Sequence, residues 1–74
     1  MKLRSIAQNQ TEITTETHRV LFSYETPVAC FSFKDCRYFR TEKSWSVTTT
    51  KHINKWLDGV EAAKIPQSML DGLA

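Results

Sequence analysis

The sequence predicts an α+β domain: a small antiparallel meander of three to four strands, packed by one main helix in the order β-β-β-α, with a short C-terminal helix. Two observations predict this fold. Between residues 19 and 41, apolar and polar side chains alternate with the period of two typical of half-buried strands, and the breaks between runs are too short for parallel neighbours. From residue 53 onward, apolar residues recur at helical spacing instead.

Three strands are predicted in the alternating region, over residues 19–24, 28–33 and 37–41. Pro27 places a turn between the first two, because its ring fixes φ and pushes the preceding residue out of the helical region. Residues 34–35 close a hairpin between the second and third, since Asp is well suited to a tight turn. This hairpin sets Cys30 opposite Phe39.

The segment before these strands is less regular. Residues 11–17 are dense in Thr and Ile with two Glu between them, which favours an exposed edge strand. Residues 1–10 are polar and without a period, and we expect a loosely ordered lead-in or a weak edge there. Residues 1–74 are predicted to form a single domain, because a chain of this length builds one core of marginal size.

A main helix is predicted to begin after Val47 and to end near Gly59, because glycine is common just past the last helical residue. Thr48 can act as its N-cap, since a Thr hydroxyl accepts a hydrogen bond from a free backbone N–H one turn later. The apolar face of this helix consists of Ile53, Trp56, Leu57 and Val60. A short second helix is predicted from Pro66, a favoured first helical position. It carries an apolar stripe that could close the sheet or pair with another copy of the chain: Met69, Leu70 and Leu73.

The composition limits the class of protein. Eight aromatic residues among 74 argue against a disordered chain. We expect neither an enzyme nor a cofactor site in a chain this short. No apolar run approaches the ~20 residues that cross a membrane, and the residues after Met1–Arg4 do not form a signal peptide, so no membrane partner is expected.

The two cysteines, Cys30 and Cys36, are predicted to be free thiols. The hairpin register places them opposite phenylalanines rather than each other, and a disulfide needs closely spaced Cα atoms. A secreted mini-protein would carry four or more cysteines. The sequence therefore indicates a reducing cytoplasm.

Two motifs carry a resemblance. Residues 23–29 read Ser-Tyr-x-Thr-x-Val-Ala, and residues 46–52 read Ser-x-Thr-Thr-x-x-His. With the Tyr-Phe-Arg-Thr strand between them, over residues 38–41, they resemble a family of small uncharacterised proteins carried by tailed bacteriophages. The resemblance covers residues 20–57 and implies a phage product in the cytoplasm of the infected bacterial host. It implies no activity.

Positive charge gathers in one part of the chain. Residues 34–55 hold six basic residues against two acidic ones, a local net charge of +4, interleaved with Tyr38, Phe39 and Trp45. Cations that displace counterions and rings that stack on bases are typical of a nucleic-acid surface. The alternative is a solvated basic face with the rings in the core. Trp45 is predicted to lie either in the core or at an interface, whereas Trp56 belongs to the apolar stripe.

The start of the main helix is a second candidate site. Residues 48–51 (Thr-Thr-Thr-Lys) place hydroxyls, free N–H groups and a cation where a phosphate or carboxylate could bind, or they simply cap the helix. His52 follows, but spacing pairs it with neither a nucleophile nor an orienting carboxylate. The spacing of the His and Cys residues does not match a zinc site, so no metal is expected.

These observations predict a non-enzymatic phage accessory protein that acts by binding. The first hypothesis is nucleic-acid binding through the basic hairpin and helix start, with these residues: Arg37, Arg40, Lys43, Trp45, Thr49, Thr50, Lys51 and Lys55. The alternative is an inhibitor or modulator of a host protein, for anti-defence or host takeover, that acts through a protein–protein interface. A homodimer is compatible with either hypothesis.

Overall fold

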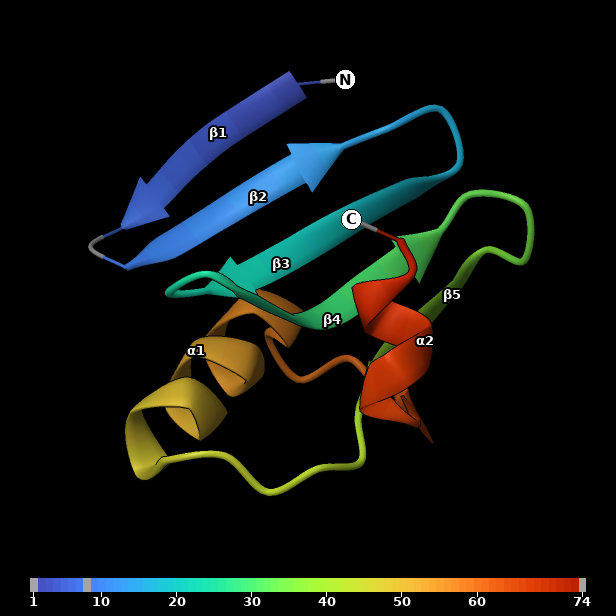
Figure 1. The fold of residues 1–74 in the computed structure, drawn as a ribbon. Coiled ribbons are helices and arrows are strands. Elements are labelled where there is room, and N and C mark those ends of the chain that lie inside the picture. The colour runs from blue at the N-terminus through green and yellow to red at the C-terminus, as the bar shows by residue number, and fades with distance from the viewer. Residues whose placement is uncertain (1, 8, 74) are drawn as a thin grey trace.

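The computed structural model describes residues 2–7 and 9–73. In chain order the elements are β1 (Lys2–Ala7), β2 (Gln10–Thr14), β3 (His18–Ser23), β4 (Thr26–Ser32), β5 (Arg37–Thr41), α1 (Val47–Leu57), β6 (Ala63–Ile65) and α2 (Gln67–Asp71) (Figure 1). The α+β class is confirmed.

The six strands form one mixed sheet in sequence order, from β1 at one edge to β6 at the other. The first five strands are antiparallel neighbours, whereas β6 pairs with β5 in parallel. The predicted meander of three to four strands is therefore too small. The parallel neighbour was missed because α1 supplies the crossover that such a pair needs, and the three residues of β6 are too few to show a period.

The N-terminal segment forms the edge of the sheet. β1 spans Lys2–Ala7, so the weak edge is observed there rather than a loose lead-in, while Met1 and Gln8 of that segment lie outside the described residues. β2 covers only Gln10–Thr14 and lies between β1 and β3, so the expectation of an exposed edge strand over residues 11–17 is wrong.

The central hairpin agrees closely with the sequence. β5 has the predicted bounds, and Cys30 lies opposite Phe39 as expected. Both cysteines are free thiols. The preceding turn lies at residues 24–25, with Tyr24 in the left-handed region at φ 57°, so the prediction of a turn at Pro27 is wrong: Pro27 lies within β4, opposite Phe22, where the register of the β3–β4 pair shifts. β4 consequently begins at Thr26.

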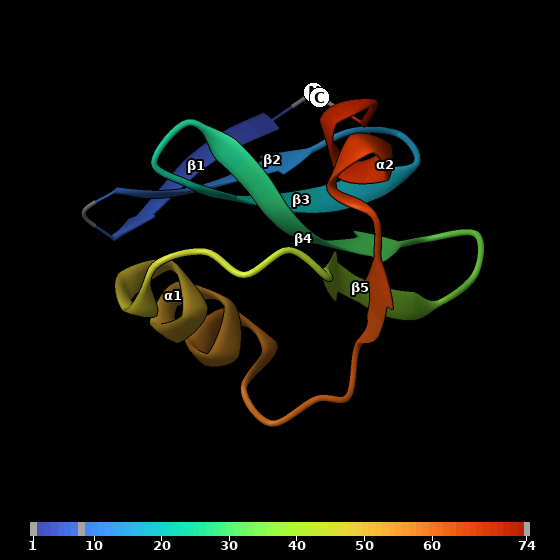
Figure 2. The ribbon, with the colours of Figure 1, turned by 60° about the horizontal axis from the view of Figure 1, so that its bottom comes forward.

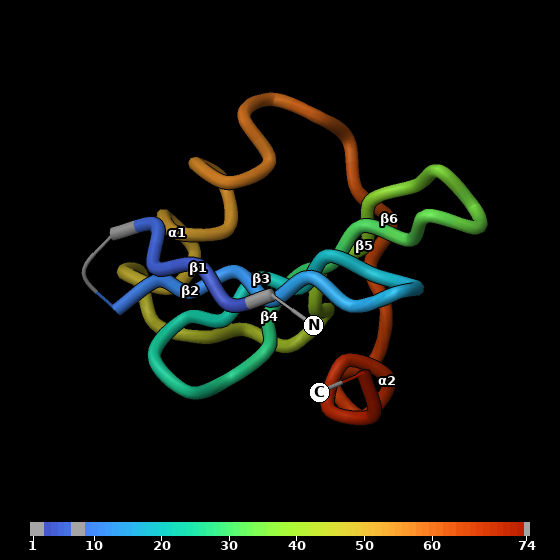
Figure 3. Tube along the Cα trace, turned by 90° about the horizontal axis from the view of Figure 1, so that it is seen from above, coloured from blue at the N-terminus to red at the C-terminus, as the bar shows by residue number. Residues whose placement is uncertain are grey.

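The sheet is covered on both faces. Figure 3 shows α1 on one side of the strands and α2 on the other. On the α1 side, Ile53 and Leu57 pack on a buried cluster of the sheet: Leu21, Val28 and Ala29. On the α2 side, Leu70 packs on Val20 and Cys30. Both α1 and α2 therefore contribute apolar side chains to the core.

The helix bounds correct two details. Ser46 is the N-cap of α1, since its side chain accepts a hydrogen bond from the Thr49 backbone N–H, so the prediction of Thr48 is wrong. The helix ends at Leu57, and Asp58 and Gly59 both take positive φ. Val60 thus lies beyond the helix and is 46% exposed rather than part of the apolar face.

The second helix is one turn long. α2 begins at Gln67 with Pro66 at the N-cap position, one residue later than predicted. Of its apolar stripe Leu70 is fully buried, whereas Met69 is 58% exposed. Figure 2 shows the segment from α1 to β6 looping away from the sheet before the chain returns to its edge. No helix of the described residues is long and apolar enough to cross a membrane.

Candidate functional site

The structure does not gather the predicted site residues on one surface. Arg37 shares its face of β5 with Phe39, on the α2 side of the sheet, and its guanidinium carbon lies 5.4 Å from the centre of the Phe39 ring. Arg40 lies on the opposite face, toward α1. Its guanidinium donates to Asn54 Oδ1 at 3.3 Å, and its Nε is buried without a hydrogen-bond partner. The two arginines cannot contact one ligand across the sheet.

Trp45 belongs to the packed structure more than to an open surface. It is half-buried against the cluster on the α1 side, and its Nε1 donates to Gln67 Oε1 at 3.3 Å. The ammonium group of Lys43 lies 4.3 Å from the centre of the Trp45 ring, an intramolecular cation–π contact. These contacts tie the chain before α1 to α2.

At the start of α1, where a phosphate or carboxylate was predicted to bind, the polar groups form hydrogen bonds within the protein. Thr49 is only 6% exposed, and its Oγ1 contacts the hydroxyls of Ser46 and Ser23 at 3.3 and 3.2 Å. The Thr50 hydroxyl donates to the backbone carbonyl of Ser46. Lys51 is exposed beside them. These hydrogen bonds cap the helix, which was the predicted alternative to anion binding.

His52 has a partner that sequence spacing did not indicate. Its Nδ1 lies 2.8 Å from Ser23 Oγ, at the end of β3. Ser23 is 2% exposed and also contacts Thr49, so its oxygen is not open to a substrate. Among the described residues no carboxylate is hydrogen-bonded to the imidazole. The pair joins α1 to the sheet and does not form an accessible nucleophile and base.

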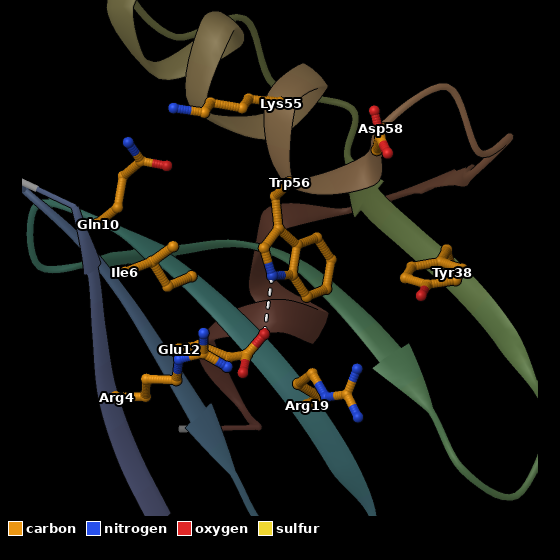
Figure 4. A pocket seen from close by; sticks show the side chains of 9 residues that line it. All are labelled: Arg4, Ile6, Gln10, Glu12, Arg19, Tyr38, Lys55, Trp56 and Asp58. Carbon is orange, nitrogen blue, oxygen red and sulfur yellow. Dashed lines mark hydrogen bonds between the residues drawn. The ribbon is translucent and has the colours of Figure 1, made fainter.

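A different concavity lies on the α1 side of the sheet, with a volume of about 390 Å³. Its lining comes from β1, β2, β3 and β5 and from the C-terminal end of α1 (Figure 4): Arg4, Ile6, Gln10, Glu12, Arg19, Tyr38, Lys55, Trp56 and Asp58. Of the predicted site residues, only Lys55 is among them. We call this concavity and the rings beside it the aromatic face.

Trp56 occupies the centre of the aromatic face. Figure 4 shows its indole reaching from α1 toward the strands, where Nε1 donates to Glu12 Oε1 at 3.0 Å. The ring also packs against the buried cluster, so the expectation of a core residue is met only in part. A half-buried indole with a bound N–H presents a ring held in one orientation.

Three further rings continue from Trp56 across the sheet. Tyr38 meets Trp56 edge to face, with ring centres 5.7 Å apart. Phe31 lies 4.6 Å from Tyr38, and Phe33 lies 5.7 Å from Phe31. Phe31 and Tyr38 are direct cross-strand partners, which places them on the same face. The row is half-buried at Trp56, Tyr38 and Phe31 and exposed at Phe33.

Basic side chains border this row. Arg19 is opposite Phe31 in the β3–β4 register, and its guanidinium carbon lies 6.0 Å from the centre of the Phe33 ring. Arg4 is opposite Glu12 in the β1–β2 register, and Lys55 projects from α1. Arg4 and Arg19 lie outside the basic segment of residues 34–55 and are brought to this site only by strand pairing. A count of charge along the sequence could not find them.

The buried thiol offers no alternative chemistry. Burial raises the pKa of the Cys30 thiol to about 11, because the apolar surroundings disfavour the thiolate. Cys30 is therefore a core residue of the α2 side at neutral pH. Among the described residues no group of three His, Cys, Asp or Glu side chains is placed to hold a metal ion.

Comparison with known proteins gives a family and no activity. Residues 1–72 match a family of unknown function designated DUF8033. No curated protein and no solved structure matches the chain. The resemblance to tailed-phage proteins stays a prediction, since the family description names no source.

Proposed function

This chain belongs to the DUF8033 family, and we propose that it is a non-enzymatic binding protein that binds single-stranded nucleic acid on its aromatic face. The row of rings bordered by arginines is the observation that supports this proposal. The proposal keeps the nucleic-acid hypothesis and moves the site from the hairpin and helix start to the α1 side of the sheet.

The rings supply the sequence-independent part of the interaction. Stacking of a base on an aromatic side chain contributes about 1–3 kcal/mol. Tyr38 and Phe31 are neighbours on adjacent strands, so successive bases can be placed along the row. Phe33 extends the row to the exposed hairpin.

The cations supply the phosphate contacts. Arg4, Arg19 and Lys55 line the concavity against two carboxylates, Glu12 and Asp58. The Glu12 carboxylate already accepts the indole N–H of Trp56. The basic residues come from β1, β3 and α1, on several sides of the concavity, which suits a strand that crosses it.

The shape of the site favours single strands over duplexes. Protein elements that read a duplex protrude into its grooves. Here Trp56 and Tyr38 line a concavity between α1 and the sheet, and a flipped-out base of a single strand can reach rings in such a position.

A matched pair of arginines tests the proposal. Arg19→Ala removes a cation from the aromatic face, whereas Arg37→Ala removes one from the opposite face of the sheet. Titration of a labelled single-stranded oligodeoxynucleotide is expected to show weaker binding for Arg19→Ala only. The slope of log affinity against log salt should fall by about 0.7 for each lost phosphate contact. Equal effects of both substitutions, or no binding by the unaltered protein, would contradict the proposal.

A protein partner is the second candidate, and the edge strand favours it. β1 is a free edge, and it exposes Leu3 (70%) and Ile6 (40%). Such an edge can accept another strand. Leu3→Lys should then abolish stoichiometric co-purification of a host protein while leaving oligonucleotide binding unchanged. Recovery of the same partner with Leu3→Lys would count against this candidate.

The proposed setting is the cytoplasm of a bacterium infected by a tailed phage. Two observations support it: the resemblance of residues 20–57 to tailed-phage proteins, and two free thiols in a chain of this size.

A further inference from the structure

The aromatic face has a carboxylate among its rings, and we propose that Glu12 gives the bound strand a preference for guanine. This inference rests on the proposed single-strand function and adds a base specificity to it. It starts from the hydrogen bond that Trp56 Nε1 donates to Glu12 Oε1.

The geometry leaves most of this carboxylate available. An ionised carboxylate has about four acceptor positions, of which the indole uses one. Glu12 lines the concavity, and among the described residues its second oxygen has no hydrogen-bond partner, so that oxygen can accept from a ligand bound there (Figure 4). The Trp56 bond fixes the carboxylate, and less conformational entropy is therefore lost when a ligand binds.

Base chemistry then selects guanine. Its N1–H and N2 amino group are adjacent donors that match the two oxygens of a carboxylate. Cytosine and adenine present an amino donor beside a ring nitrogen acceptor, and thymine presents one N–H between two carbonyl oxygens. These acceptors would face the negative charge of Glu12, whereas guanine pairs with it through two charge-assisted hydrogen bonds.

The neighbouring cations make the site compatible with a polyanion. Arg4 lies opposite Glu12 in the β1–β2 register, and Arg19 lines the same concavity from β3. Figure 4 shows both arginines beside Glu12 on the strand side of Trp56. Phosphates that flank the guanine can therefore contact them while the base reaches the carboxylate.

The ligand itself provides the sharpest test. Short oligothymidylates that carry one central guanine, inosine, adenine or cytosine are titrated against the unaltered protein. Inosine lacks only the N2 amino group, so guanine is expected to bind about fivefold or more tightly than inosine, the effect of losing one good base contact. The adenine and cytosine strands should bind no better than inosine.

The protein variant is Glu12→Gln, with Glu16→Gln as its control. The amide keeps an oxygen to accept the Trp56 N–H but replaces the other oxygen with a donor. Glu12→Gln should lose the preference for guanine over inosine, because the amide no longer offers two acceptors to N1–H and N2, and its salt slope should be unchanged. Glu16 is exposed in the turn between β2 and β3, so Glu16→Gln should keep the preference. Intrinsic fluorescence of the variant checks that Trp56 remains packed.

Each outcome is decisive. Failure of the unaltered protein to bind any strand overturns the proposed function. Equal binding of the guanine and inosine strands leaves that function standing and overturns the role of Glu12. A guanine preference that survives in Glu12→Gln also overturns it. The comparison of ligands needs no variant, so it holds even if Glu12→Gln does not fold.

Discussion

Trp56 has two roles at the scale of a single residue. Its ring packs on the cluster that includes Leu21 and Ile53, and its N–H binds Glu12 in the open concavity. Tryptophan suits such a position because it combines a large apolar body with one polar group. The same side chain therefore contributes to stability and orients the carboxylate of the proposed binding face.

The two cysteines differ in environment, and this difference can be measured. Cys30 is buried with a pKa of about 11, so at pH 8 only about one thiol in a thousand is ionised. Cys36 is exposed in the hairpin loop. Iodoacetamide at pH 8 is expected to modify Cys36 and to spare Cys30 in the native protein, and to modify both in denaturant. Mass spectrometry counts the adducts, and equal native rates would place Cys30 outside the core.

At the scale of the elements, the start of α1 shows how short-range chemistry sets a boundary. Three threonines follow one another there, yet Ser46 provides the cap because its hydroxyl reaches the Thr49 N–H at 3.3 Å. The Thr49 hydroxyl then joins Ser23 of β3. The three threonines have poor helix propensity, so the cap and this contact with the sheet stabilise the first turn of α1.

A pair of substitutions distinguishes the observed cap from the predicted one. Ser46→Ala should lower the free energy of unfolding by about 1 kcal/mol, the usual cost of losing an N-cap. Thr48→Ala should change it by less than about 0.5 kcal/mol, since Thr48 is exposed. Urea denaturation of the three proteins measures the differences. A larger loss for Thr48→Ala would move the cap back to Thr48.

At the scale of the whole molecule, one sheet separates two small cores. Leu21 and Ala29 face α1, whereas Val20 and Cys30 face α2, as alternation along neighbouring strands requires. A chain of this length has little apolar area, and division over two faces makes each cluster small. Both clusters share β3 and β4, so they are expected to unfold together.

Substitutions at two neighbouring residues of α2 test the core on the α2 side of the sheet. Leu70 is fully buried, and Leu70→Ala should cost about 2–5 kcal/mol of unfolding free energy. Met69 is 58% exposed, and Met69→Ala should be nearly neutral. Thermal unfolding followed by circular dichroism should show one transition that shifts only for Leu70→Ala. If both variants matched the unaltered protein, α2 would not contribute to the core.

Hairpin strands and helix position were predictable because their signals are local. Alternation over residues 19–41 indicated β3, β4 and β5, and the hairpin residues placed Cys30 opposite Phe39. The helical spacing of Ile53 and Leu57 identified the buried face of α1. Periods and turn residues act over a few positions, so one sequence is sufficient to read them.

Pairing over long distances was decided only by the tertiary structure. β1 and β6 have no clear period, and they become strands because a neighbour offers them backbone hydrogen bonds. Glu12 and Trp56 are 44 positions apart, yet they meet because β2 and α1 border the same concavity. The sequence by itself determined the hairpin and the buried face of α1, whereas the aromatic face exists only after distant strands and the helix have packed against one another.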